Sequence, residues 1–199
     1  MAILVLDSRW PDMIPLSVVS RLAGPLEYTS EVPVSVRWAL ADTPAGAGQG
    51  WLVTTNALDP DVVKRAKDEE VVRVPTLDDP VAEAVETMRC ARERGEWERA
   101  MTHEALLPYL EEEAREFADA VREGLGDGDL KKELSDVLLQ VLFHAELARE
   151  RGAFDFGDVA AAFVEKMKSR APYLFDGSAG LVAVEEQERL WAEGKSREA

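Results

Sequence analysis

The stretches "YLEEEAREFADAV" (109–121) and "LKKELSDVLLQVLFHAELA" (130–148) decide the fold of this chain. In both, apolar residues recur at intervals of three and four, which is typical of helices that bury one face. Glycines at positions 124, 126 and 128 separate the two stretches, and Gly152 follows the second. Because glycine ends helices, we predict helices over residues 103–124 and 127–151, joined by a short turn and therefore antiparallel.

Helical spacing also dominates the rest of the chain beyond about residue 75, where Pro becomes rare. There the pattern predicts three more helices, over residues 79–95, 156–170 and 184–197. Five helices with short connections are typical of an antiparallel bundle. We therefore expect an all-α domain over residues 76–199.

The first 75 residues follow a different pattern. Four short β-branched runs, bounded by Pro, Gly, Asp and Asn, predict strands: "AILVLD" (2–7), "VPVSVRW" (32–38), "GWLVTTN" (50–56) and "EVVRVP" (70–75). Helices are expected over residues 15–24 and 59–70, and "ADTPAGAGQG" (41–50) is expected to be a loop. The prediction is a small α/β domain over residues 1–75, without a Gly-x-Gly-x-x-Gly or Walker sequence to indicate a nucleotide site. The chain as a whole is thus expected to be α+β.

Composition narrows the choice of partners. The formal net charge of −16 argues against nucleic acid as a direct partner, because clustered Lys and Arg bind its phosphates. A small phosphorylated ligand is compatible with this charge, since a metal ion can carry the ligand's charge. The single cysteine, Cys90, excludes an internal disulfide and fits a reducing compartment. With a short apolar start, no basic leader and no apolar run of about 18 residues, the chain is predicted to be cytoplasmic and to make no membrane contact.

Carboxylates lie close to the apolar faces of the two central helices. In the 103–124 helix, Glu113 borders the apolar stripe and Glu116 lies one step further around. In the 127–151 helix, Glu133, Asp136 and Gln140 share a narrow sector, and the helix is expected to be buried nearly all round. An unpaired buried carboxylate costs several kcal/mol, so each of these groups needs a compensating partner.

Two kinds of partner fit these carboxylates. Salt bridges are one alternative, because Lys131, Lys132 and Arg115 lie near in sequence, although the two lysines are expected to project away from the sector. The other, which we favour, is a divalent cation such as Mg²⁺ held by two E-x-x-[DE] pairs on facing helices. Its ligands would be Glu113, Glu116, Glu133 and Asp136. A di-iron site is not supported, because neither His103 nor His144 has a Glu three residues before it.

Basic residues recur at a matching spacing further along the chain. Lys166 and Arg170 lie four apart, as do Trp191 and Lys195, so each pair shares one helix face. Arg binds phosphate through two parallel hydrogen bonds, and Lys supplies a point charge. Each pair alone is weak evidence, since exposed Lys and Arg are common and Trp is more often a core residue. Together with the acidic pairs they predict a triphosphate site.

The acidic pairs followed by the basic pairs form a pattern that resembles the MazG-like nucleoside triphosphate pyrophosphohydrolases. The resemblance runs over about residues 97–195. The family's E-E-x-x-E and E-x-x-D motifs match Glu112-Glu113-x-x-Glu116 and Glu133-x-x-Asp136, and its K-x-x-x-R and W-x-x-x-K elements match the two basic pairs. Two elements depart from the family's pattern: its opening C-P-W-D motif is Gly95-Glu96-Trp97-Glu98 here, with only Trp97 kept, and Ser135 replaces the usual Gly before Asp136. The first 75 residues resemble the leader region of actinobacterial MazG proteins.

The resemblance implies an all-α MazG-type dimer that hydrolyses NTP to NMP and pyrophosphate with Mg²⁺, or with Mn²⁺ as a substitute, in nucleotide-pool house-cleaning. Glu112 would join a second metal or accept the proton of the attacking water. Lys166, Arg170 and Lys195 would neutralise the phosphates, and Trp191 would line the site. The alternative is a non-catalytic helical module that binds nucleotide or a regulatory protein, and Mg²⁺-dependent turnover separates the two. The residues leave the preferred base and sugar open.

Overall fold

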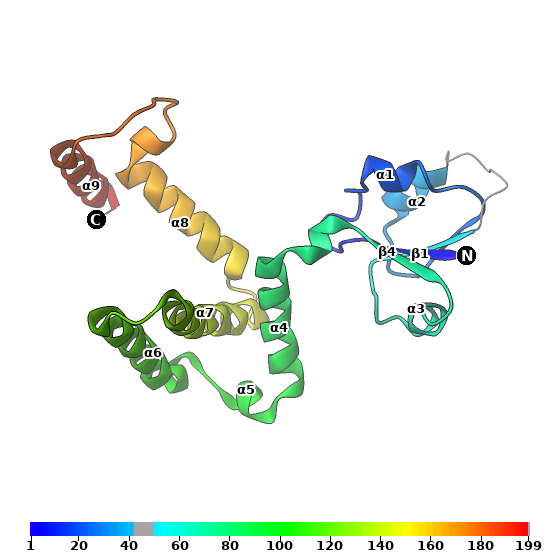
Figure 1. Ribbon diagram of the computed structural model, residues 1–199, viewed down its shortest axis with the longest axis horizontal. Helices are drawn as coiled ribbons and strands as arrows, with labels where there is room; N and C mark the ends of the chain where they lie inside the picture. The colour runs from blue at the N-terminus through cyan, green and yellow to red at the C-terminus, as the bar shows by residue number, and fades with distance from the viewer. Residues whose placement is uncertain (42–49, 199) are drawn as a thin grey trace. The chain divides into compact units, whose positions relative to one another are not determined.

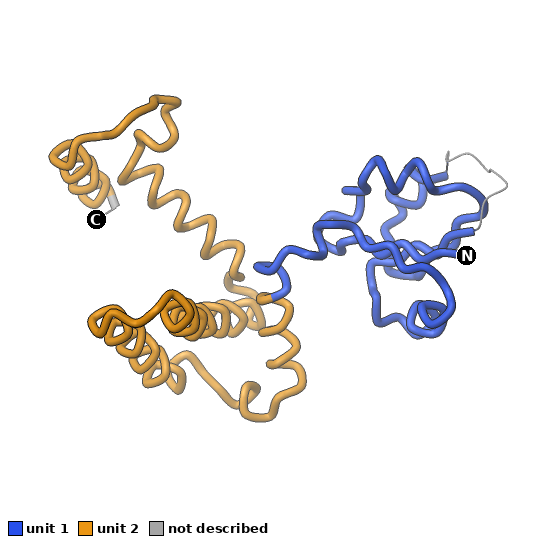
Figure 2. The backbone as a smooth tube through the Cα atoms, viewed as in Figure 1, with its two compact units in different colours: residues 1–83 blue, residues 84–199 orange. Residues whose placement is uncertain are grey.

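The structure of the protein is a computed structural model that describes residues 1–41 and 50–198. The chain divides into two compact units, Met1–Glu83 and Ala84–Ala199 (Figure 2). Each unit has a hydrophobic core of its own. Most of the loop predicted over residues 41–50 lies outside the described residues.

The first unit is a four-stranded parallel sheet with helices on both faces (Figure 1). Its strands are β1 (Ala2–Val5), β2 (Leu26–Tyr28), β3 (Trp51–Thr54) and β4 (Glu70–Arg73), and their order in the sheet is β2-β3-β1-β4. In register, Ala2 of the central strand β1 lies opposite Trp51 on one side and Glu70 on the other. The helices are α1 (Leu16–Val19), α2 (Val34–Ala41) and α3 (Pro60–Arg65).

Successive side chains of β1 point to opposite faces of the sheet, so the strand contributes to a hydrophobic cluster on each face. Ala2 and Leu4 belong to the cluster that includes Val36 of α2. Ile3 belongs to the cluster on the opposite face, with Val62 of α3. Every residue of β1 is buried, because the strand is central and both of its faces are covered, as parallel sheets require.

The strand predicted over residues 32–38 is wrong, because most of these residues form α2. The carbonyl of Pro33 accepts a helical hydrogen bond from the N–H of Arg37 at 3.2 Å. Val36 and Leu40, four residues apart, are buried, whereas Trp38 is 74% exposed. This four-residue spacing lets an amphipathic helix pack on the sheet, and that packing overrides the β propensity of the valines. Strand β2 was not predicted, because its three residues are too few to show an alternating pattern in the sequence.

Helices form the second unit, with bounds close to those predicted. They are α4 (Pro80–Arg94), which begins in the first unit, α5 (Glu96–Ala100), α6 (His103–Glu123), α7 (Asp127–Glu150), α8 (Phe156–Arg170) and α9 (Val184–Glu198). The predicted fold class is confirmed: a small α/β part precedes an all-α part. Among the α-helices described in the second unit, the short α5 is the one that was not predicted. Within the described part of the chain, none of the helices is long and apolar enough to cross a membrane.

Local signals explain where α6 begins and ends. The hydroxyl of Thr102 caps the helix by accepting a hydrogen bond from the N–H of Ala105 at 3.2 Å. Gly124 ends the helix in the left-handed conformation, with φ of 67°, and the N–H of Leu125 bonds to the carbonyl of Ala120 at 3.0 Å. Because α7 starts at residue 127, the turn is tight and the two helices run antiparallel.

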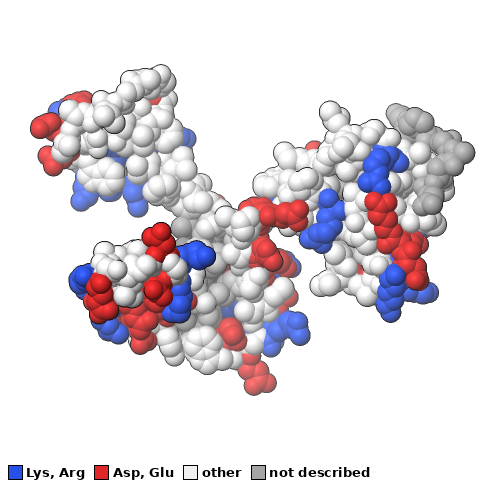
Figure 3. Space-filling view, viewed as in Figure 1, with Lys and Arg blue, Asp and Glu red and all other residues white. Residues whose placement is uncertain are grey.

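The helices of the second unit pack chiefly as two pairs, α6 on α7 and α8 on α9 (Figure 1). A core joins α4 to the α6–α7 pair, formed by Met88, Leu106, Leu142 and Phe143. The expectation that α7 is buried all round is wrong for the single chain, since Leu134, Leu138 and Leu139 are 51%, 42% and 44% exposed. The visible surface over α8 is also mostly uncharged (Figure 3). Both pairs therefore carry apolar surface that faces solvent in the single chain.

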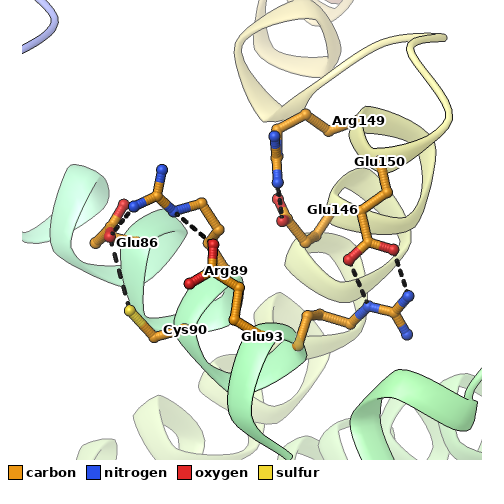
Figure 4. Close-up of polar contacts among 8 residues, drawn as sticks. Glu86, Arg89, Cys90, Glu93, Glu146, Arg149 and Glu150 are labelled. Atoms are coloured by element: carbon orange, nitrogen blue, oxygen red, sulfur yellow. Dashed lines mark hydrogen bonds and ion pairs between the residues drawn. The ribbon is translucent and has the colours of Figure 1, made fainter.

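Arg92 ties α4 to the C-terminal end of α7 and to α5. Its side chain is 7% exposed, and its guanidinium donates to both carboxylate oxygens of Glu150. The same guanidinium donates to the backbone carbonyls of Glu98 and Met101. Figure 4 shows the Glu150 carboxylate pointing from α7 toward α4. The Arg92 guanidinium holds the pKa of Glu150 below its usual range, so this ion pair stabilises the fold at neutral pH.

Candidate metal centre

Three carboxylates meet where α6 passes α7. Glu133 and Asp136 lie three residues apart on α7, and Glu113 faces them from α6. Each residue offers one oxygen, and these atoms all lie within 4.8 Å of one another. The antiparallel pairing therefore brings together three of the four residues predicted to hold a metal ion. We call Glu113, Glu133 and Asp136 the acidic cluster.

The acidic cluster is partly withdrawn from water. The Glu133 side chain is 13% exposed, and its Oε2 atom is buried without a hydrogen-bond partner. Burial raises the pKa of Glu113, and so do the negative charges of Asp136, Glu116 and Glu112. A raised carboxyl pKa means that ionised Glu113 opposes folding at neutral pH, and this opposition fades as the pH falls through that pKa. A cation among these oxygens would relieve the repulsion.

Lys132 contacts the acidic cluster, so the prediction that it projects away is wrong. Its Nζ atom lies 2.9 Å from Oε1 of Glu133 and 3.6 Å from Oδ2 of Asp136. The prediction followed the direction in which the residue leaves the helix, but a four-carbon side chain can reach back along the surface to residue i+4. The side chain is 67% exposed, so it can turn into solvent without leaving a cavity. The lysine and a metal ion would therefore compete for the same oxygens.

The other two predicted acids lie outside the acidic cluster. Glu112 and Glu116 are exposed, and Glu112 comes within 4.0 Å of Arg115 on its own helix. Both are close enough to raise the pKa of Glu113. The role of Glu116 as a metal ligand and that of Glu112 as a second-metal ligand or proton acceptor stay predictions.

The donor set of the acidic cluster fits a hard divalent cation. All three groups are carboxylates, which Mg²⁺ and Mn²⁺ prefer, whereas a structural zinc site is built mainly from Cys and His. The buried Oε2 of Glu133 is an acceptor that a cation could satisfy without displacing another protein group. The acidic cluster is therefore a candidate site for an ion of this class.

The predicted phosphate-binding residues gather on the other helix pair. Lys166 and Arg170 lie one turn apart on α8, and Trp191 and Lys195 lie one turn apart on α9. The Arg170 guanidinium lies over the Trp191 ring, 5.2 Å from its centroid. Lys166 and Lys195 are exposed. The acids and the cations thus occupy two different helix pairs.

Comparison with known proteins matches both parts of the chain. Residues 101–175 match the model of the MazG nucleotide pyrophosphohydrolase domain, and residues 1–73 match that of the MazG N-terminal domain. Over its whole length the chain is 38% identical to a nucleoside triphosphate pyrophosphohydrolase of Mycolicibacterium smegmatis and 34% identical to one of Mycobacterium tuberculosis. The chain belongs to the MazG-like family.

These two MazG relatives are longer than this chain, which spans 63% and 62% of their lengths. The crystal structure of a MazG-related protein from Thermotoga maritima resembles the chain with a TM-score of 0.51 at 27% sequence identity. That likeness covers 58% of this chain and 98% of the other. The matched MazG domain contains the acidic cluster, Lys166 and Arg170, whereas Trp191 and Lys195 lie beyond its last matched residue.

Three polar residues in the contact between α6 and α7 of the MazG domain have no predicted role. His103 and His144 face each other, with their Nδ1 atoms 2.8 Å apart and their rings stacked at 5.1 Å. Gln140 is 3% exposed, and its Oε1 atom is buried without a hydrogen-bond partner. The sequence carries one signal for them, because Gln140 and His144 follow Asp136 at four-residue intervals on one stripe of α7.

Gly194→Ala is expected to weaken the α8–α9 pair of the MazG protein. A Cβ atom at Gly194 would lie 2.7 Å from the carbonyl oxygen of Ser169 and 2.8 Å from Cα of Arg170, so the helices must move apart. We expect a loss of about 1–3 kcal/mol in the free energy of unfolding, measured by urea denaturation with circular dichroism. The control is Gly128→Ala, where no atom lies within 4 Å of the added Cβ and where alanine favours the helix. An equal loss in both variants would contradict this account.

Lys132→Gln is expected to strengthen the binding of a divalent cation such as Mg²⁺ at the acidic cluster. The substitution removes the ammonium group that competes for Glu133 and Asp136. An exposed ion pair contributes little, so the apparent Mg²⁺ dissociation constant should fall only modestly, by up to about fivefold. The rise of Tm with Mg²⁺ concentration measures that constant, and Lys131→Gln at an exposed neighbouring position is the control. Weaker Mg²⁺ binding by Lys132→Gln would show that the lysine does not compete.

Proposed function

We propose that this chain hydrolyses nucleoside triphosphates to nucleoside monophosphates and pyrophosphate in a Mg²⁺-dependent reaction, with Mn²⁺ as a substitute. The observation that carries the proposal is the acidic cluster, with its buried and unpartnered Glu133 oxygen, inside the matched MazG domain. The names of the two mycobacterial relatives describe the same activity. A house-cleaning role in the nucleotide pool and a cytoplasmic location accompany this proposal. Nucleic acid is not an expected partner, given the net charge of −16.

The acidic cluster would hold the divalent ion, with Glu116 as a further ligand. The bound ion would polarise phosphate oxygens and lower the pKa of a coordinated water. Glu113 contributes a carboxylate that is crowded by negative charge, as its raised pKa indicates, and such crowding favours the uptake of a cation. Glu133 is largely buried, so its carboxylate is already confined where a ligand is needed.

The remaining predicted residues would act on the water and on the phosphates. Glu112 is exposed, and it would accept the proton that the attacking water loses as it adds to the α-phosphorus. Lys166, Arg170 and Lys195 would neutralise the β- and γ-phosphates as negative charge builds on the leaving pyrophosphate. Trp191 would line the site beside Arg170.

Separation of the reaction products tests the proposed reaction. The purified chain, incubated with NTPs and Mg²⁺, should release NMP and pyrophosphate in equal amounts, and chelation of the metal by EDTA should stop the release. NDP and orthophosphate as products would contradict attack at the α-phosphorus. Nucleotide binding without turnover, in Mg²⁺ or in Mn²⁺, would favour a non-catalytic nucleotide-binding or regulatory module.

A homodimer would bring the two helix pairs onto one substrate. Both pairs expose apolar side chains: on α7 Leu134 is 51% exposed and Leu138 is 42% exposed, and on α8 Phe163 is 59% exposed and Val164 is 40% exposed. Two copies can bury such faces reciprocally in a two-fold symmetric contact. The dimer that we propose therefore places the α8–α9 cations of one protomer against the acidic cluster of its partner.

Mixing two inactive variants tests the shared site. Glu113→Gln damages only the acids and Lys166→Ala only the cations, so each variant alone is expected to be inactive. After co-expression about half of the dimers are mixed, and each mixed dimer holds one fully intact site if the two protomers share their sites. About a quarter of the unmodified activity should return. Verified mixed dimers without activity would place all residues of one site in a single chain.

A further inference from the structure

Gln140 is a buried polar residue without a role in the proposed function. It is 3% exposed, and the carbonyl oxygen of its side chain, Oε1, is buried without a hydrogen-bond partner. An unpaired buried acceptor costs stability, so an apolar side chain of the same size would serve packing better at this position. The carbonyl oxygen is an unsatisfied hydrogen-bond acceptor, because none of the described residues of the chain donates a hydrogen bond to it.

The spacing along α7 places Gln140 on the helix stripe that carries two members of the acidic cluster. Gln140 lies one turn after Asp136 and two turns after Glu133, so the three side chains share one stripe of the helix. Side chains on a helix generally lean toward its N-terminus, and for Gln140 that is the direction of Asp136. The unpartnered Oε2 of Glu133 lies on the same stripe. The two unsatisfied acceptors therefore belong to one polar surface at the metal centre.

A neutral acceptor beside a carboxylate cluster suits a water molecule bound to the metal ion. Mg²⁺ loses its waters reluctantly and keeps several of them when carboxylates hold it, and each water has O–H groups to donate. The amide carbonyl of Gln140 can accept such a hydrogen bond without adding negative charge. This matters because the carboxylates around Glu113 already repel one another, as the raised pKa of Glu113 indicates.

His144 is the rival partner for the Gln140 oxygen. It lies one turn further along α7, and its Nε2 atom is also buried without a partner. Gln140 Oε1 and His144 Nε2 both lack partners, so these two atoms do not bond to each other. The observations therefore favour the acidic cluster as the place where the Gln140 oxygen is used.

We propose that Gln140 is a positioning residue of the metal centre, whose side-chain carbonyl accepts a hydrogen bond from a water bound to the divalent ion. The inference rests on the proposed metal site, and it adds the group that orients the water of that site. Outer-shell groups of this kind typically change metal affinity by about 10- to 100-fold.

Gln140→Met tests the proposal, because methionine keeps the length of the side chain and removes the acceptor. No described residue bonds the lost oxygen, so the Tm measured without Mg²⁺ should stay the same or rise. The apparent Mg²⁺ dissociation constant, taken from the rise of Tm with Mg²⁺, should increase by about tenfold or more. A residue that serves only packing would lower the Tm and leave the dissociation constant unchanged.

Two further variants separate the loss of the acceptor from a general change in packing. Gln140→Glu keeps an acceptor at the same position, so it should bind Mg²⁺ at least as tightly as the unmodified chain. Leu142→Met changes a buried residue of the apolar core on the same helix, so it should leave the dissociation constant unchanged. In turnover, Gln140→Met should raise the Mg²⁺ concentration for half-maximal rate by about tenfold, while kcat at saturating Mg²⁺ falls much less.

The outcomes distinguish this inference from the proposed function. An unmodified chain whose Tm does not respond to Mg²⁺ would overturn the metal centre and the role of Gln140 together. If the unmodified chain responds and Gln140→Met responds equally, the metal centre stands and the inference about Gln140 is overturned. A weaker response of Gln140→Met that Leu142→Met shares would likewise overturn it, because the effect would then come from packing.

Discussion

Glu113→Gln is expected to abolish NTP hydrolysis and, at the same time, to raise the Tm measured without Mg²⁺. Burial and the surrounding carboxylates raise the pKa of Glu113, so its ionised form opposes folding at neutral pH. The neutral amide removes this repulsion but is a poorer metal ligand. Turnover should fall by at least about 100-fold, and the rise of Tm with Mg²⁺ should disappear. Product separation and thermal denaturation measure the two effects.

Two further variants serve as the negative and positive controls for Glu113→Gln. Glu111→Gln makes the same chemical change at an exposed position on the same helix, so it should keep both the turnover and the response to Mg²⁺. Asp136→Asn removes a second member of the acidic cluster and should lose both. Full activity in Glu113→Gln and in Asp136→Asn would remove the acidic cluster from the mechanism.

Arg92→Met is expected to produce the largest loss of stability. The buried guanidinium bonds to the carboxylate of Glu150 and to two backbone carbonyls at the end of α5, so methionine would leave several acceptors without a donor. The Glu150 side chain is 38% exposed, and solvent screening reduces the cost of leaving it unpaired. We expect a loss of about 2–3 kcal/mol in the free energy of unfolding, measured by urea denaturation.

Arg89→Met is the matched control for Arg92→Met. Arg89 lies on the same helix, is 45% exposed and pairs with Glu86 at 2.6 Å (Figure 4). An exposed pair of this kind contributes about 0.5 kcal/mol or less. If both substitutions cost the same, burial of the Arg92 contact would not be the cause of its effect.

Long amphipathic helices are the part of the fold that sequence predicts well. The bounds of α6, α7 and α8 follow from repeated apolar spacing and from glycine or capping residues at their ends. Short elements carry too few residues for a period, which is why β2 and α5 have no counterpart among the predicted elements. The valine-rich start of α2 shows the opposite failure, because local β propensity yields there to packing on the sheet.

The candidate site divides in the same way. The spacing of Glu133 and Asp136, and the position of Glu113 on the preceding helix, are sufficient to predict that these acids meet. The contact of Lys132 depends on the path of a flexible side chain, which helical spacing does not define. The unpartnered oxygen of Gln140 depends on how α6 covers α7, and this appears only when both helices are in place. The proposed pairing of the acids with the α8–α9 cations depends on how two protomers associate, and the spacing of residues in one sequence does not define that association.

Because His103 and His144 are in contact at one end of the α6–α7 pair, acid is expected to affect the stability of that end differently from the region around Glu113. Burial and the neighbouring ring lower the pKa of His144, so this contact loses stability as the pH falls below the ordinary histidine value of 6.5. About 15 Å along α6, protonation of Glu113 has the reverse effect, because it ends the repulsion among the carboxylates. Mild acidification should therefore loosen the hairpin at its histidine end while tightening it around Glu113, near the middle of α6.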